Sequence, residues 1–208
     1  MCVIAVSPKG IRQPTIAELK LMWQTNPHGA GYMIKRKKSV EIHKGFMSWE
    51  DFKRAVESEH MTKEQATIYH FRISTQCGIT PTMTHPFPLT NHMQSLKALD
   101  LNCDIAVAHN GIIPMTTNSN EKEFSDTALF IGKYMSRLIH NTQDLLDENI
   151  QTIIKELINS KMAIMDKYGN IVTIGQFFNH DGILLSNEHH LAIKEFYNWK
   201  GAFAKCIV

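Results

Sequence analysis

Hydrophobic residues occur along the chain in short runs, and most of these runs predict strands. The run at 3–6 is entirely apolar, while those at 66–72 and 104–108 are rich in apolar, aromatic or β-branched residues, as in strands buried on both faces. Further stretches with strand character lie at 31–34, 39–42, 162–166, 171–174 and 182–185.

Helices are predicted where an apolar face follows a residue that can cap a helix. Thr15 and Glu18 have capping-box spacing ahead of a first helix, which should end near Asn26 because the residue before a proline avoids helical angles. By the same patterns, further helices are expected to begin at Ser48 and Ser125 and to cover 143–158 and 188–199.

The segment 77–102 is rich in proline, threonine, histidine and asparagine, and it predicts a long ordered loop. Loops of this length inside compact domains usually carry function. The strand at 104–108 follows it and should present His109, Asn110 and Gly111 at its tip, where a glycine permits close approach of the backbone.

Strands near both ends of the sequence, with helices between groups of strands, predict an α+β fold with largely antiparallel sheets. The 208 residues fit one domain, 1–208, that is long enough to bury a core. We see no internal repeat and no low-complexity segment.

Composition narrows the possible partners. The chain is 43% hydrophobic and 20% charged with a net charge of +2, which is ordinary for a soluble protein and does not suggest nucleic acid. The basic run at 35–38 is more readily a solvated hairpin tip than a phosphate-binding patch. No segment approaches the ~20 apolar residues that cross a bilayer, and no signal peptide is visible, so we expect a cytoplasmic protein without membrane contact.

Cysteine spacing argues against metals and disulfides. Cys2, Cys77, Cys103 and Cys206 have neither the paired spacing of a zinc site nor the density of a disulfide scaffold, and they suit a reducing cytosol. The segment 188–190 has two histidines but no third ligand at zinc-like spacing, which favours a polar helix start. We expect no metal and no cofactor.

The second position of the chain carries the clearest candidate chemistry. Methionine aminopeptidase removes Met1 when the next side chain is small, so the mature chain is expected to begin at Cys2. A thiol titrating near ~8.5 would then lie beside an α-amine titrating near ~7.7 to 8.0, and the amine could serve as its base directly or through water. An inert buried cysteine is the alternative.

Four motifs follow Cys2 in an order that chance rarely produces: His70 to Gly78, Thr84-His85-Pro86-Phe87, Val107 to Ile113 with His109-Asn110-Gly111, and Ser125-Asp126-Thr127. In order and approximate spacing they resemble the class II glutamine amidotransferases, whose glutaminase domains are N-terminal-nucleophile hydrolases. The resemblance implies a four-layer α/β/β/α sandwich and glutamine as the substrate.

The resemblance also implies a role for each site residue. Arg72 would hold the glutamine α-carboxylate with Thr75 beside it, and Asp126 would hold the α-ammonium. Asn110 and the N–H of Gly111 would form the oxyanion hole for attack by Cys2. Taken singly, each could be an ordinary strand-end, helix-start or turn residue.

Other family positions are matched less closely. His85 and His109 are expected to be structural, and His28 lies in a glycine-containing turn expected near the nucleophile. Ile73 and Gln76 replace the tryptophan and histidine that are usual in the sugar-phosphate synthases. These replacements concern the loop that covers bound glutamine in that family.

These expectations lead to three hypotheses. The first is a stand-alone glutamine amidotransferase, of the type found in bacteria and phages, that passes ammonia to a separate synthase or acceptor-binding subunit. The second is a hydrolase of a γ-glutamyl or other amide bond that needs no partner. The third is a non-catalytic binding module of the same fold.

Overall fold

The computed structural model describes residues 1–74, 79–115 and 121–191. In these ranges the strands form two antiparallel sheets, with strand orders β10-β11-β1-β4-β2-β3-β6 and β5-β7-β8-β9. The expectation of an α+β fold with largely antiparallel sheets is therefore confirmed. The strands of the larger sheet are β1 (Val3–Ser7), β2 (Ala30–Lys35), β3 (Val40–Phe46), β4 (Thr67–Phe71), β6 (Asp100–Cys103), β10 (Phe178–His180) and β11 (Ile183–Leu185). Those of the smaller sheet are β5 (Phe87–Pro88), β7 (Ile105–Asn110), β8 (Lys161–Asp166) and β9 (Ile171–Ile174).

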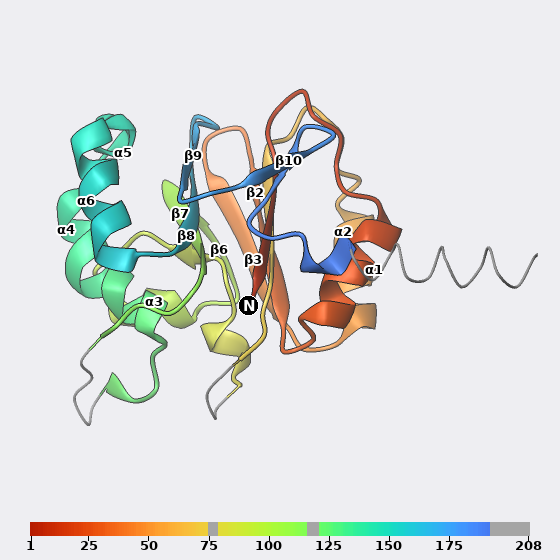
Figure 1. The fold of residues 1–208 in the computed structure, drawn as a ribbon, viewed down its shortest axis with the longest axis horizontal. Helices are drawn as coiled ribbons and strands as arrows, with labels where there is room; N and C mark the ends of the chain where they lie inside the picture. The colour runs from red at the N-terminus through yellow and green to blue at the C-terminus, as the bar shows by residue number, and fades with distance from the viewer. Residues whose placement is uncertain (75–78, 116–120, 192–208) are drawn as a thin grey trace, which may run out of the picture.

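The two sheets lie face to face in the middle of the molecule, with helices outside them (Figure 1). Helices α1 (Ile16–Thr25) and α2 (Trp49–Ser58) pack on the outer face of the larger sheet. The outer face of the smaller sheet is covered by α3 (Asp126–Phe130), the π-helix η4 (Ile131–Met135), α4 (Ser136–Leu138), α5 (Thr142–Leu146) and α6 (Glu148–Ile158).

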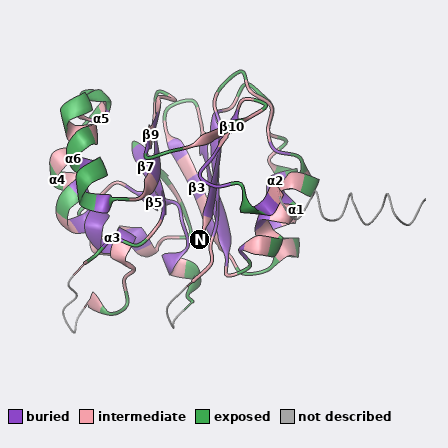
Figure 2. Ribbon diagram, viewed as in Figure 1, coloured by how far each residue is buried: buried purple, intermediate pink, exposed green. Residues whose placement is uncertain are grey.

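Burial on both faces explains why the first four residues of β1 are all apolar. Val3 and Ala5 face the α1 and α2 side, whereas Ile4 and Val6 face the smaller sheet. The smaller sheet meets them with short side chains that let the two sheets approach: Ala106, Ala108 and Ala163. Figure 2 shows the buried residues concentrated in the two sheets.

Helix starts follow the sequence signals. The Thr15 side chain accepts the backbone N–H of Glu18, and the Glu18 side chain accepts the backbone N–H of Thr15, as in a full capping box. Ser48 and Ser125 cap α2 and α3 through the N–H groups of Asp51 and Ala128. These three predicted caps are confirmed.

The prediction of one helix at 143–158 is wrong, because the helix is interrupted at Asp147. This residue has φ −72° and ψ 117°, and its carboxylate accepts the N–H groups of Asn149 and Ile150. An aspartate that caps the next turn is more stable there than within a continuous helix. Two helices, α5 and α6, result.

The prediction of an unbroken loop at 77–102 is also wrong in part. Short 3₁₀ turns occur at η1 (Pro81–Met83) and η2 (Met93–Lys97), β5 pairs with β7, and β6 pairs with β3. β5 has two residues and β6 has alternating exposed positions, so neither carries an apolar pattern of its own. β10 was not predicted for the same reason.

The last predicted helix, 188–199, lies outside the described residues beyond Leu191. Within the described ranges, every helix is too short or too polar to cross a membrane.

Candidate active site

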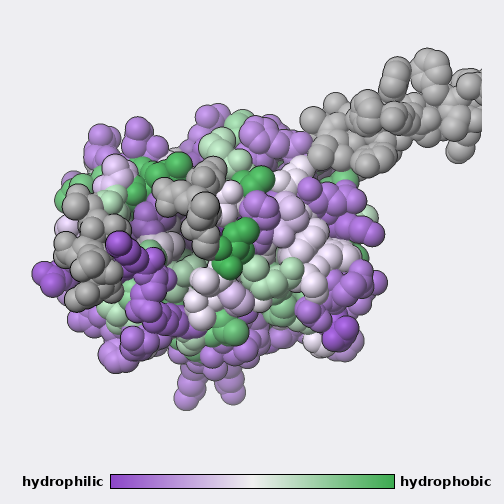
Figure 3. All heavy atoms as spheres, turned by 90° about the horizontal axis from the view of Figure 1, so that it is seen from below, coloured by the Kyte–Doolittle hydropathy of each residue, from purple (hydrophilic) through white to green (hydrophobic). Residues whose placement is uncertain are grey.

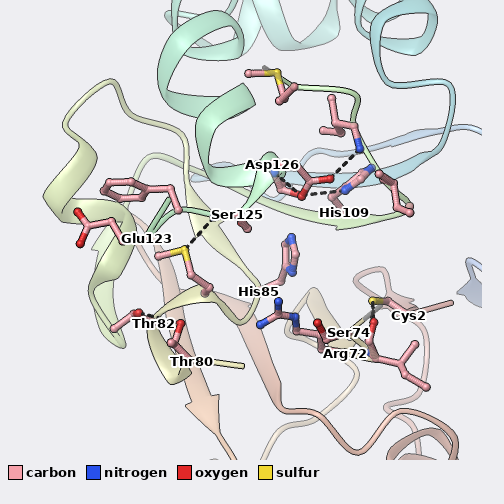
Figure 4. A pocket seen from close by; sticks show the side chains of 18 of the residues that line it. Cys2, Arg72, Ser74, Thr80, Thr82, His85, His109, Glu123, Ser125 and Asp126 are labelled. Carbon is pink, nitrogen blue, oxygen red and sulfur yellow. Dashed lines mark hydrogen bonds between the residues drawn. The ribbon is translucent and has the colours of Figure 1, made fainter. Parts of the chain in front are cut away.

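A cavity of about 720 Å³ lies where the start of β1, the ends of β4 and β7 and the start of α3 come together. Cys2, Arg72, Gly111 and Asp126 all line it, and Figure 4 shows Cys2, Arg72 and Asp126 around the same space. Asn110 lies next to this wall and is only 3% exposed. Thr75, the remaining predicted site residue, lies outside the described residues. Seen from below the view of Figure 1, hydrophobic side chains lie near the centre of the face with hydrophilic ones around them (Figure 3).

Cys2 is held by the backbone of the residue after Arg72. Its Sγ donates to Ile73 O at 3.6 Å and accepts from Ile73 N at 3.4 Å. Burial raises the pKa of the Cys2 thiol, while the Ile73 N–H, the terminal amine and the Arg72 guanidinium act in the opposite direction. A thiol with a raised pKa needs a base beside it to become a nucleophile.

Arg72 is the first residue after β4, and its backbone is fixed by the turn that precedes β2. Arg72 N donates to Gly29 O at 2.8 Å, and His28 N donates to Arg72 O at 3.0 Å. A Cβ on Gly29 would lie 2.7 Å from a methyl of Thr84, so the close approach requires glycine. The glycine-containing turn predicted near Cys2 is thus confirmed.

The Arg72 guanidinium has an unused donor. Its Nη1 is buried and has no hydrogen-bond partner in the described part of the chain. Burial lowers the pKa of Arg72, and the nearby Cys2 and Asp126 partly offset that shift. A buried guanidinium N–H without a partner, in the wall of a cavity, suits an anionic group of a ligand.

Asp126 ties the start of α3 to the segment that follows β7. Its Oδ2 accepts from Ile113 N at 2.7 Å, and its Oδ1 accepts from Thr127 N at 2.7 Å. A carboxylate has about four lone-pair sites, so these bonds leave capacity for a ligand donor.

Asn110 is the last residue of β7, and Gly111 follows it beside a neighbouring turn. A Cβ on Gly111 would lie 2.4 Å from Ser160 Cβ, which explains why the position is glycine. Asn110 Nδ2 donates to Ser186 Oγ at 2.8 Å, a contact that the sequence motifs did not predict.

Three buried histidines lie in a row at the cavity, and two of them, His85 and His109, are part of its lining. Ring centroids are 4.3 Å apart for His70 and His85 and 6.4 Å apart for His85 and His109. Burial lowers the pKa of His70 to about 3 and that of His109 to about 4, and it lowers the pKa of His85 as well. All three are therefore neutral at pH 7 and do not repel the Arg72 guanidinium.

His109 has a structural role, because both of its ring nitrogens have hydroxyl partners. Nδ1 lies 2.9 Å from Thr127 Oγ1, and Nε2 lies 2.7 Å from Ser160 Oγ. These bonds link β7 to α3 and to the turn before β8. Over residues 1–74, 79–115 and 121–191, no group of three or more His, Cys, Asp or Glu side chains could hold a metal ion.

Lys44 is a buried lysine that sequence reasoning missed. It is 3% exposed, and its Nζ donates to Thr82 O at 2.9 Å and to Leu96 O at 2.7 Å. Nζ also lies 3.8 Å from the centroid of the Phe87 ring. Lys44 therefore holds the 80–97 segment that forms one wall of the cavity. The alternation of residues in β3 could have revealed it, because every second side chain of a strand points to the same face and Lys44 shares the inward face with Val40 and Ile42.

We expect the Lys44 ammonium to make stability depend on pH. Burial lowers the pKa of Lys44 to about 6, whereas an unfolded lysine titrates near ~10.4. Between these values the unfolded chain binds more protons, so the free energy of unfolding rises with pH by up to about 1.4 kcal/mol per pH unit. Lys44→Met should lose this rise when urea unfolding is compared at pH ~6.5 and pH ~9.

The exposed Lys20 provides the matched control. Lys20→Met should keep the wild-type dependence of stability on pH. A Lys44→Met variant with the wild-type slope would show that the ammonium stays charged in the folded protein.

Ser186 and Asn187 were also missed. Ser186 bonds Asn110, and the Asn187 side chain donates to Cys2 O. Neither residue belongs to a recognised sequence motif. Ser186 also accepts a hydrogen bond from Ile4 N, 182 positions away in the sequence, and a local pattern cannot reveal such a contact.

Comparison of the chain with models of protein families and with the sequences of curated proteins finds no match. The positions and contacts of the residues described above are therefore what supports a function.

Proposed function

We propose that the protein is a glutamine amidotransferase of class II, acting through Cys2 after removal of Met1. The observation that carries this proposal is the meeting of Cys2, Arg72, Gly111 and Asp126 in one cavity, although they come from four separate segments of the chain. On this proposal, the two sheets and their covering helices form the four-layer α/β/β/α sandwich of N-terminal-nucleophile hydrolases.

Glutamine would be held at its zwitterionic end. The free N–H of Arg72 donates to the α-carboxylate, and the Asp126 carboxylate accepts from the α-ammonium. These contacts direct the side-chain amide toward Cys2.

The reaction is an acyl transfer through a thioester. The α-amine of Cys2 takes the thiol proton, and Sγ bonds to the amide carbon while the C=O electron pair moves to oxygen. The Gly111 N–H and the Asn110 amide stabilise that oxyanion. Its collapse expels the amide nitrogen, which leaves as ammonia after gaining the proton. Water then cleaves the thioester and releases glutamate.

Removal of Met1 is compatible with the packing. The Met1 side chain is 67% exposed, whereas Val3, which follows Cys2, is fully buried. Loss of the first residue therefore leaves β1 in place and turns the backbone nitrogen of Cys2 into an amine. Ammonia would pass to a separate synthase or acceptor subunit in the cytoplasm.

The size of the cavity supports a second candidate, a γ-glutamyl or other amide hydrolase. At about 720 Å³, with a lining that also includes Lys97 and Glu123, the cavity lies in the range of sites for drug-sized ligands. It would therefore admit an amide larger than glutamine.

Intact mass of the purified chain tests the proposal. After treatment with 6-diazo-5-oxo-norleucine, a glutamine-mimicking electrophile, wild type should have lost Met1 and gained one adduct, and Cys2→Ala should gain none. Retained Met1, or labelling of another residue, would contradict the amidotransferase and favour a non-catalytic binding module. Competition by γ-glutamyl amides in preference to glutamine would favour the hydrolase.

A further inference from the structure

Ser186 lies directly after β11 and joins the two sheets at the candidate site. The residue is fully buried, and its Oγ accepts the N–H of Ile4 at 2.8 Å. The same Oγ lies 2.8 Å from Asn110 Nδ2. Ile4 belongs to the larger sheet and Asn110 to the smaller one, so one hydroxyl connects the strand that follows the nucleophile to the strand that carries the oxyanion donors.

The hydrogen bonds around Ser186 depend on the orientation of the Asn110 amide. With Nδ2 facing Ser186, Oγ receives two N–H groups, and the buried Asn110 Oδ1 has no partner among the described residues. A buried carbonyl oxygen without a donor is unfavourable. Half a turn about the last side-chain bond exchanges the two ends of the amide in nearly the same space. The Ser186 hydroxyl then donates to Oδ1 and still accepts from Ile4.

We propose that Ser186 is a positioning residue for the oxyanion hole. Its hydroxyl donates to Asn110 Oδ1, and this bond turns the Asn110 NH₂ group toward the oxygen that becomes negative when Cys2 attacks. The inference rests on the proposed function, because an oxyanion donor has a role only if Cys2 attacks a carbonyl.

The neighbouring residue fixes the nucleophile from the same side. Asn187 Nδ2 donates to Cys2 O, and Asn187 Oδ1 accepts from His189 N at 3.2 Å. The pair 186–187 therefore holds both Cys2 and Asn110. An amide fixed in this way stabilises the developing charge without reorganising, whereas a freely turning amide presents its own oxygen part of the time.

The test compares two reactions of Cys2 in the processed chain. Acylation by L-glutamate γ-(p-nitroanilide), followed as the single-turnover release of p-nitroaniline, passes through an oxyanion. Alkylation by iodoacetamide does not. Ser186→Ala should slow acylation about 10- to 100-fold, less than the 100- to 1,000-fold cost of removing a donor outright. KM and the alkylation rate should stay at their wild-type values.

Ser7→Ala is the matched control, since Ser7 is also fully buried in β1 and its Oγ has no partner among the described residues. It should acylate like wild type. Ser186→Thr keeps a hydroxyl and should acylate faster than Ser186→Ala. Because Ser186 acts through Asn110, adding Ser186→Ala to Asn110→Ala should cause little further loss.

Four outcomes would overturn the inference: acylation of Ser186→Ala at the wild-type rate, equal slowing of acylation and alkylation, Ser186→Thr no faster than Ser186→Ala, or additive losses in the double variant. A wild-type chain that is never acylated overturns the proposed function itself and the inference with it. Failure of the inference about Ser186 can therefore be told apart from failure of the proposed function.

Discussion

Replacing Cys2 by alanine should abolish glutamine hydrolysis, with a fall in kcat of about 10⁴- to 10⁶-fold. The reason is that no thioester forms without Sγ, and the other donors of the cavity can only assist direct attack by water. Release of glutamate from glutamine by the purified chain measures the effect.

Cys103→Ala is the control for this substitution, because Cys103 is another partly buried free cysteine and lies on β6, outside the cavity lining. It should retain wild-type activity. Glutamate release by Cys2→Ala at more than a hundredth of the wild-type rate would rule out Cys2 as the nucleophile.

Replacing Arg72 by alanine should lower kcat/KM for glutamine about 100- to 1,000-fold, mainly by raising KM. Truncating one partner of a buried, hydrogen-bonded charge pair costs about 2 to 5 kcal/mol, and 1.4 kcal/mol corresponds to a factor of ten. Arg72→Lys should recover little, because an ammonium cannot reproduce the fork of a guanidinium. Steady-state kinetics over a wide range of glutamine concentration separates KM from kcat.

The exposed Arg54 on α2 serves as the control, since its side chain is 78% exposed and pairs only with Asp51 at 3.5 Å in the described structure. Arg54→Ala should leave both constants unchanged. An Arg72→Ala enzyme whose KM stays within a few-fold of wild type would show that Arg72 does not hold the substrate carboxylate.

The elements that sequence predicted well are those whose signal is local. β1 is apolar over 3–6 because both of its faces are buried, and α1 begins directly after Thr15 because the capping box there satisfies backbone groups at the start of the helix. The strands β5 and β6 exist through pairing with β7 and β3, so their own residues do not reveal them. To recognise Asp147 as a cap from the sequence, one would have to compare the stability of two short helices with that of one long helix over the same residues.

The residues of the candidate site also fall into those that the sequence predicted and those that it did not. Cys2, Arg72, Gly111 and Asp126 were predicted as a group, and the cavity brings them together. Asn110 was predicted to be an oxyanion donor, and the contact of its amide with Ser186 was not predicted. Residues that support these groups were missed, since the contacts of Lys44, Ser186 and Asn187 link segments far apart in sequence.

The position of β1 has a consequence for folding. β1 lies between β4 and β11, and the bonds between Ile4 and Ser186 span 182 positions. Contacts of such separation form late, because the entropy of closing the intervening loop must first be overcome. β1 therefore gains its second neighbour only once β11 (Ile183–Leu185), near the end of the described chain, is present. On the proposed function, Cys2 would reach its reactive position only in chains in which β11 and the 186–187 pair have docked.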